Sequence, residues 1–220
     1  METQILAVLL GKVRPFRGDD EPSAIGKLPV ADSVAVGLMG LAGDEQADRT
    51  VHGGIDKAIH HYPADHYDWW REYLGDAPLL DAPGAFGENI STEGLNEQNV
   101  FLGDRFRLGT ALVEVTQARQ PCWKLDHRFQ ARGVMAQVVK TRRTGWYYRV
   151  LEPGHVRAGD ALELVERPYP EWSLASLFAL LIGGEAKDRL ADLRVLRDVP
   201  VLAETWKARR AKLAEQFGAD

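Results

Sequence analysis

The stretch ALVEVTQARQPCWK, residues 111–124, joins an alternating segment to a rigid turn. Residues 111–117 are rich in β-branched side chains and predict a strand. Pro121 cannot donate a hydrogen bond to a sheet, so we expect it to end that strand. Cys122 therefore lies just past a strand end, with cationic neighbours at Arg119 and Lys124.

Cys122 is the only cysteine in the chain, and its setting supports two interpretations. Cationic neighbours favour the thiolate, which is the form that attacks electrophiles or binds a metal. A single cysteine is also often a small buried apolar residue with no chemical role. The turn by itself leaves both interpretations open.

Other segments of the chain predict further short strands separated by glycine turns. Apolar or alternating runs occur at residues 5–10, 34–36, 59–62 and 146–151, and two similar Gly-Asp turn units occur at 102–109 and 158–165. Helices are expected at 64–74, where Pro63 occupies the first turn, and once or twice between 123 and 143. Many short strands with few long helices indicate a β-barrel or sandwich.

The composition changes after the segment Pro168-Tyr-Pro170. Three helices are predicted beyond it: residues 174–182 with Ser173 as N-cap, residues 187–196, and a helix starting at Pro200 and ending near residue 216. We therefore expect two domains, a β domain over residues 1–167 and a three-helix subdomain over residues 168–220.

Length and composition narrow the classes of function. A chain of 220 residues with net charge −5 has no overall basic field that would favour nucleic acid. One cysteine excludes an internal disulfide and an all-cysteine zinc site or iron–sulfur cluster. The N-terminus has no signal-peptide pattern, and the longest apolar run, residues 177–182, is too short for a bilayer. The expected location is the cytoplasm, without a membrane partner.

A dense block of polar residues lies at 43–57, among glycines that let a ligand approach the backbone. Arg49, His52 and Lys57 are candidates to bind a phosphate or an acidic ring edge. A solvated loop with turn glycines is the plainer interpretation. A divalent metal site is a weaker one, because Gly53-Gly54 argues against the helical spacing that its ligands would need; those ligands would be Asp44, Asp48, His52 and Asp56.

Two further polar segments have alternative interpretations. In Gly84-Ala-Phe-Gly-Glu-Asn89 the glycines present Glu88 for proton transfer and Asn89 for bonding to a heterocycle, although a structural bulge explains them nearly as well. His60 and His61 are adjacent on a predicted strand and should point to opposite faces, so we expect at least one to be structural.

Taken in order, four blocks resemble the MOSC domain family, named after the C-terminus of molybdenum-cofactor sulfurase. They are the segment 43–57 with its His52-Gly-Gly-Ile-Asp-Lys57, then Phe86-Gly-Glu-Asn89, Leu102-Gly-Asp104 and Arg119-Gln-Pro-Cys122. The similarity is to the bacterial 6-N-hydroxylaminopurine reductase branch, which carries a three-helix C-terminal extension. This resemblance implies a mainly β fold with added helices, a MOSC-type β-barrel followed by a small three-helix subdomain.

The resemblance also implies a cofactor and a set of site residues. The cofactor is the molybdenum cofactor, Mo-molybdopterin, with Cys122 as the thiolate ligand of the metal, which suits a soft sulfur donor. The implied cofactor-binding residues are Arg49, His52, Lys57, Asn89, Arg119 and Cys122. The implied catalytic residues are Cys122, Asp48 and Asn89.

The implied reaction is the reduction of an N-hydroxylated base or related small molecule to an amine, with two electrons and two protons. Because the chain has no dinucleotide-binding fingerprint and too few cysteines for a cluster, a separate reductase must supply the electrons. The helical extension is expected to pack on the barrel or form a homodimer, and docking the reductase is the other option. Two alternative functions stay open: a sulfur-carrier or cofactor-handling module with a persulfide on Cys122, and a cofactor-binding protein without turnover.

Overall fold

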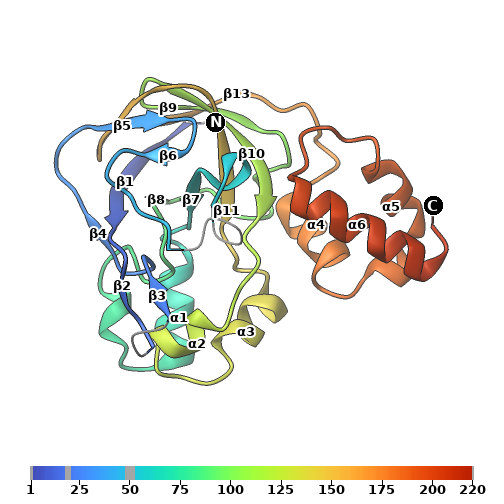
Figure 1. The fold of residues 1–220 in the computed structure, drawn as a ribbon, viewed down its shortest axis with the longest axis horizontal. Coiled ribbons are helices and arrows are strands. Elements are labelled where there is room, and N and C mark those ends of the chain that lie inside the picture. The colour runs from blue at the N-terminus through green and yellow to red at the C-terminus, as the bar shows by residue number, and fades with distance from the viewer. Residues whose placement is uncertain (1, 18–20, 48–52, 220) are drawn as a thin grey trace.

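A computed structural model describes residues 2–17, 21–47 and 53–219 of the chain (Figure 1). Its strands are β1 (Glu2–Gly11), β2 (Arg14–Pro15), β3 (Pro22–Ser23), β4 (Lys27–Pro29), β5 (Val34–Gly37), β6 (Gly40–Leu41), β7 (Ile59–His61), β8 (Ile90–Thr92), β9 (Arg105–Leu108), β10 (Ala111–Ala118), β11 (Trp146–Glu152), β12 (Gly154–Val156) and β13 (Ala161–Glu166). Its helices are α1 (His66–Leu74), α2 (Lys124–Arg128), α3 (Val134–Thr141), α4 (Leu174–Leu181), α5 (Leu190–Leu196) and α6 (Glu204–Phe217), with 3₁₀ turns η1 (Ile55–Lys57), η2 (Pro78–Leu80) and η3 (Ala186–Asp188).

The central sheet closes into a barrel. In the described part of the chain seven strands follow one another in the order β13-β9-β10-β11-β7-β8-β1, and β1 pairs back with β13. The pairs are antiparallel except β7 with β8, and β4 extends the sheet beyond β1. The predicted mainly β fold with additional helices is therefore confirmed. Closure matters for function because it brings strands that are distant in sequence to one barrel end.

The burial of β10 does not alternate along the strand as its sequence does, because both faces of the strand are covered. Val113 and Val115 are buried, and so are the polar Thr116 and Gln117. Thr116 accepts the N–H of Ala203 through its carbonyl, and the Gln117 side chain accepts from the Thr205 hydroxyl. The C-terminal helices thus lie against one face of this strand, and the barrel core fills the other.

A second apolar cluster supports the end of the barrel that carries α1, α2 and α3 (Figure 1). Tyr67 and Trp70 of α1 are buried, and Tyr62 stacks on Phe86 with ring centroids 4.0 Å apart. Leu125 of α2 is part of the same cluster. Because α2 begins two residues after Cys122, this packing fixes the turn that holds the thiol.

The C-terminal part contains the three predicted helices, which lie to one side of the barrel (Figure 1). The Ser173 hydroxyl accepts from the backbone N–H of Ser176 at 3.2 Å, which confirms it as the N-cap of α4. Apolar residues of these helices, among them Leu177 and Phe178, belong to the same contiguous core as the barrel residues. The division of the chain into domains at residues 167 and 168 stays a prediction.

The predicted start of the last helix is wrong. Helix α6 begins at Glu204 and not at Pro200. Leu202 and Ala203 are buried, and Ala203 has the extended backbone of an N-cap. Residues 200–203 are not helical, and Ala203 donates its N–H to the Thr116 carbonyl of β10. Contacts with the barrel therefore override the helix-start signal of Pro200.

None of the helices in residues 2–17, 21–47 and 53–219 combines the length and apolar character that crossing a membrane requires.

Candidate functional site

The turn after β10 presents the cysteine at the edge of a cavity. Backbone hydrogen bonds fix both sides of this turn: Arg119 N–H donates to the Gly145 carbonyl at 2.9 Å, and the Cys122 carbonyl accepts from Leu125 at 3.1 Å. The thiol is unpaired and half-buried, and it lines the cavity. The prediction that Cys122 follows a strand end on a turn is therefore confirmed, and its partial exposure disfavours the interpretation as a small buried apolar residue.

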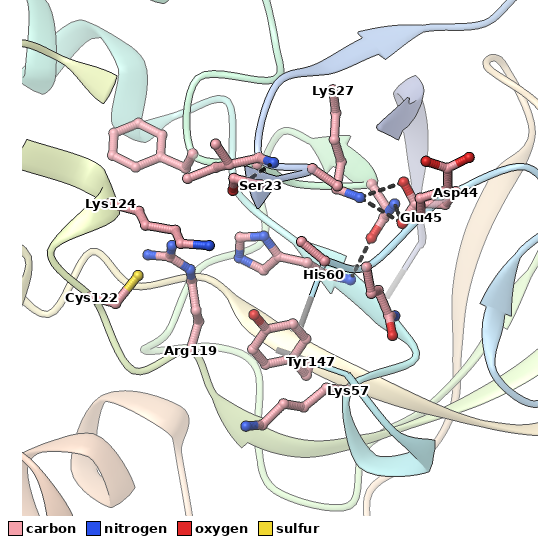
Figure 2. A pocket seen from close by; sticks show the side chains of 17 residues that line it. Ser23, Lys27, Asp44, Glu45, Lys57, His60, Arg119, Cys122, Lys124 and Tyr147 are labelled. Carbon is pink, nitrogen blue, oxygen red and sulfur yellow. Dashed lines mark hydrogen bonds and ion pairs between the residues drawn. The ribbon is translucent and has the colours of Figure 1, made fainter. Parts of the chain in front are cut away.

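The cavity is lined by residues of β3, β4, β7 and β11 and of the turns between strands (Figure 2). Its polar lining residues are Ser23, Lys27, Asp44, Glu45, Gln46, Lys57, His60, Asn89, Arg119, Cys122, Lys124 and Tyr147. Four predicted site residues, Lys57, Asn89, Arg119 and Cys122, therefore line a single cavity. The cavity contains more cationic than anionic side chains, which suits an acidic ligand.

Arg119 projects from the end of β10 along the wall next to Cys122 (Figure 2). Its side chain is buried, with 6% of the residue exposed, and its Nη1 atom has no hydrogen-bond partner. Burial raises the pKa of Tyr147, and the neighbouring Arg119 guanidinium opposes that shift. A buried guanidinium nitrogen without a partner is costly unless a ligand supplies the acceptor.

A buried ion pair forms another part of the wall. Lys27 Nζ lies 2.5 Å from both carboxylate oxygens of Asp44, and both side chains are almost fully buried. Asp44 also accepts from the backbone N–H of Gly11 at 2.6 Å. Burial lowers the pKa of Lys27, while the charge of Asp44 opposes that shift. The charge of Asp44 is thus balanced by that of Lys27.

Asn89 braces this pair and the strand beside it. Its Nδ2 donates to Asp44 Oδ2 at 2.9 Å and to the Leu9 carbonyl at 3.1 Å, and its Oδ1 accepts from the His60 backbone at 3.1 Å. Asn89 lines the cavity, but both the nitrogen and the oxygen of its side-chain amide already bond to the protein. Its predicted catalytic and cofactor-binding role stays a prediction, and the contacts present are those of a positioning residue.

Glu88 is also engaged by the protein. Its buried carboxylate accepts from the backbone N–H groups of Gly84 at 2.6 Å and Phe86 at 3.0 Å, and from the Tyr67 hydroxyl. These bonds shape the loop that carries Gly87, whose φ is +77° and which approaches Ile25 closely. The alternative of a structural turn therefore describes Glu88 better than proton transfer does.

The two adjacent histidines of β7 do point to opposite faces. His61 is enclosed in the barrel, where Nδ1 pairs with the Tyr148 hydroxyl at 3.0 Å and Nε2 with the Thr92 hydroxyl at 2.9 Å. His60 lies on the cavity side, where its ring centroid is 5.0 Å from that of Tyr147. His61 is structural, and His60 belongs to the site.

Lys57 reaches the cavity from the 3₁₀ turn η1, which is anchored on its other side. The Asp56 carboxylate pairs with the Arg149 guanidinium at 2.5 Å and accepts from the backbone N–H of Glu204, the first residue of α6, at 3.0 Å. In the described residues no three His, Cys, Asp or Glu side chains are grouped to hold a metal. Of the four ligands of the divalent-metal interpretation, Asp48 and His52 lie outside the described residues, so this interpretation stays untested.

Three predicted site residues, Asp48, Arg49 and His52, lie outside the described residues. Ala47 and Gln46, which precede them, line the cavity. Sequence reasoning missed Lys27, His60 and Tyr147 as site residues. Strand alternation at β7 limited the histidines to one per face, but no local signal placed Lys27 of β4 or Tyr147 of β11 near the cysteine.

The sequence and the structure were compared with protein families, with curated proteins and with solved structures, and the three comparisons agree on one family. The family model described as the MOSC domain matches residues 48–163. "Protein YiiM" from Escherichia coli (strain K12) is 47% identical over 161 residues, which are 73% of this chain and 71% of that protein. A protein named "Reductase" from Gibberella moniliformis is 38% identical over 175 residues, which are 79% of this chain but 31% of that protein. The crystal structure of YiiM from Geobacillus stearothermophilus superposes with a TM-score of 0.81 at 35% identity, covering 96% of this chain and 98% of that chain.

Proposed function

The chain belongs to the MOSC domain family, and from this premise we propose that it is a molybdenum-cofactor-dependent oxidoreductase. The substrates we propose are N-hydroxylated bases or related N-hydroxylated compounds, which it reduces to amines with electrons from a separate reductase. The observation that carries the proposal is the half-buried Cys122 thiol in a cavity that also contains the unpartnered guanidinium of Arg119. The name of the fungal relative, a reductase, supports the reaction class.

The residues of the cavity fit an acidic cofactor that contains a soft metal. A phosphate-bearing ligand needs cationic donors, and Arg119, Lys57 and Lys124 line the cavity beside the thiol. A thiolate is the donor type that suits a soft metal site, and Cys122 is the only thiol in the sequence.

The positions of the cavity side chains suit different roles in binding the cofactor. Cys122 would hold the metal from a turn fixed by β10 and α2. Arg119 and Lys57 would bind the anionic part of the cofactor, and Asn89 would keep Asp44 and the His60 backbone in place. When bound, the cofactor supplies the two-electron chemistry. The roles of Asp48, Arg49 and His52 as cofactor or substrate contacts stay part of the proposal.

The test uses the full chain purified from a host grown with ample molybdenum. We expect stoichiometric molybdenum and reduction of an N-hydroxylated compound with reduced viologen as artificial donor. Cys122→Ala should lose molybdenum and activity, while the cofactor-free variant and parent should melt at the same temperature, because the half-buried thiol is in no disulfide. His127→Gln, on a histidine that bonds the Phe16 carbonyl outside the cavity, is the matched control and should keep both.

Two results would contradict the proposal and separate its alternatives. Full reductase activity in Cys122→Ala removes the ligand role of the cysteine. Cyanide-labile sulfur on Cys122 without molybdenum would instead show a sulfur carrier. Bound cofactor without turnover of any N-hydroxylated compound would show a cofactor-binding protein.

A further inference from the structure

Two polar atoms in the cavity wall have no hydrogen-bond partner. They are Nε2 of His60 and Nη1 of Arg119, and their residues are 4% and 6% exposed. Both residues line the cavity, and Figure 2 shows the imidazole of His60 directed toward the guanidinium of Arg119, with Tyr147 beside both. Buried polar groups are seldom left unpaired, so we expect a ligand in the cavity to supply partners for these atoms.

The two atoms offer opposite hydrogen-bond roles. Arg119 can only donate. Burial and the charge of Arg119 lower the pKa of His60 well below its usual value, so the imidazole is neutral and has one donor and one acceptor nitrogen. Nε2 has no partner in the protein. In the tautomer with its proton on Nδ1, Nε2 presents a lone pair.

We propose that His60 Nε2 and Arg119 Nη1 form a specificity pair that recognises the hydroxyl group of an N-hydroxylated substrate. The hydroxyl oxygen accepts from Arg119, and the hydroxyl hydrogen is donated to His60. This inference rests on the proposed function and names the part of the substrate that the cavity distinguishes. A hydroxyl satisfies both orphaned atoms, whereas an oxygen without a hydrogen leaves the His60 lone pair unpaired.

The consequence is discrimination between a hydroxyl and its methyl ether. In the reaction R–NH–OH + 2 H⁺ + 2 e⁻ → R–NH₂ + H₂O the N–O bond breaks, one proton goes to nitrogen and one to oxygen, and the external reductase supplies the electrons. The ether R–NH–OCH₃ reacts with the same balance and releases methanol. A site built to bond a hydroxyl rejects an analogue that cannot complete the bond, because its own buried group then stays unpaired.

The experiment compares N-phenylhydroxylamine with its O-methyl ether, using the loaded full chain and reduced viologen. We expect kcat/KM to favour the hydroxyl compound by about 100-fold or more. His60→Phe, which removes the acceptor and keeps a ring beside Tyr147, should reduce this preference to less than about tenfold. His60→Gln, whose amide oxygen can reach the position of Nε2, should retain more of the preference. The steric demand of the methyl group is similar in both variants, so their difference reports the acceptor.

The control is His155→Phe, on an exposed histidine of β12 outside the cavity, and it should leave the preference unchanged. Equal preference in the parent and His60→Phe overturns the specificity pair while the reductase function stands. If the loaded parent reduces neither compound, the proposed function fails and the specificity pair fails with it. The two failures are therefore distinguishable.

A second measurement needs no turnover. Histidine side-chain ¹⁵N NMR of the chain prepared without molybdenum should show His60 protonated on Nδ1 and bare on Nε2 at neutral pH, with the signals assigned by their loss in His60→Phe. A proton on Nε2 would make this atom a donor and overturn the proposal.

Discussion

At the scale of single residues, His60 and His61 show how one strand serves both stability and function. They are neighbours in β7, and the alternation of a strand sends one side chain to the cavity and the other into the barrel. His61 stacks on Trp146 with ring centroids 4.2 Å apart and bonds through both nitrogens. Burial of the ring away from water favours its neutral form.

This burial predicts acid sensitivity of the fold. Burial lowers the pKa of His61 to about 3, so below its unfolded value of about 6.5 the unfolded chain binds a proton that the folded chain does not. The free energy of unfolding should therefore fall as the pH falls through the window from 6.5 to 3. The contribution of this group amounts to about 2 kcal/mol between pH 7 and pH 5.

Urea unfolding at these two pH values measures the effect, with His61→Gln as the comparison. Glutamine does not titrate, and its amide can still bond to a hydroxyl such as that of Thr92. We expect the variant to lose clearly less stability than the parent on acidification, whatever its stability at pH 7. The same pH dependence in both proteins would show that His61 is not the group responsible.

At the scale of elements, Asp56 ties the turn η1 both to the barrel and to the last helix. Its carboxylate bonds to Arg149 of β11 and to the first N–H of α6, and its carbonyl accepts from the Thr116 hydroxyl of β10 at 2.6 Å. The next residue, Lys57, lines the cavity. One short turn therefore connects the C-terminal helices with the candidate cofactor site.

Asp56→Ala should loosen the start of α6. It removes the acceptor of an N-terminal helix N–H, which typically costs about 1–2 kcal/mol. Hydrogen exchange should show lower protection of the amides in the first turn of α6. Arg107→Gln is the control, because Arg107 pairs with Glu152 at the exposed surface and such pairs contribute little. Unchanged protection in Asp56→Ala would mean that the packing of α6 alone holds its start.

At the scale of the whole molecule, the barrel and the helices share one apolar core. Leu174, Leu177 and Phe178 of α4 are buried in the same cluster as Val113 and Val115 of β10. The backbone of Leu174 also donates to the Val100 carbonyl at 2.9 Å. The helical part is therefore packed on the barrel through apolar contacts, which favours a stabilising role for it.

A chain that ends at Arg167 should consequently fold poorly. Its barrel would expose the apolar surface that α4 covers, and large exposed apolar patches lead to aggregation. We expect the truncated protein to precipitate or to unfold at a much lower temperature than the full chain, as light scattering and calorimetry would measure. A soluble barrel with cooperative unfolding near the temperature of the full chain would instead show that residues 1–167 fold independently.

The sequence by itself determined the local features of this protein. Alternation and glycine turns gave the strands, Ser173 gave a helix cap, and the Arg119-to-Lys124 turn placed the thiol, because such signals depend on neighbouring residues. The order of four motifs gave the family. These features were sufficient to predict the barrel with its added helices and to select Lys57, Asn89, Arg119 and Cys122, which line one cavity.

The tertiary structure alone decided the composition of the cavity wall and the covering of β10. His60 and Tyr147 come from barrel strands and Lys27 from β4, which pairs with β1; only the tertiary fold brings them to the cavity of Cys122, and no local pattern encodes such distant neighbours. Helix α6 begins after the predicted Pro200 for the same reason. The N–H groups of Ala203 and Glu204 at its start donate to the Thr116 carbonyl and the Asp56 carboxylate, which are distant in sequence. Contacts between distant segments are chosen by the packing of the whole chain, and the site is made of such contacts.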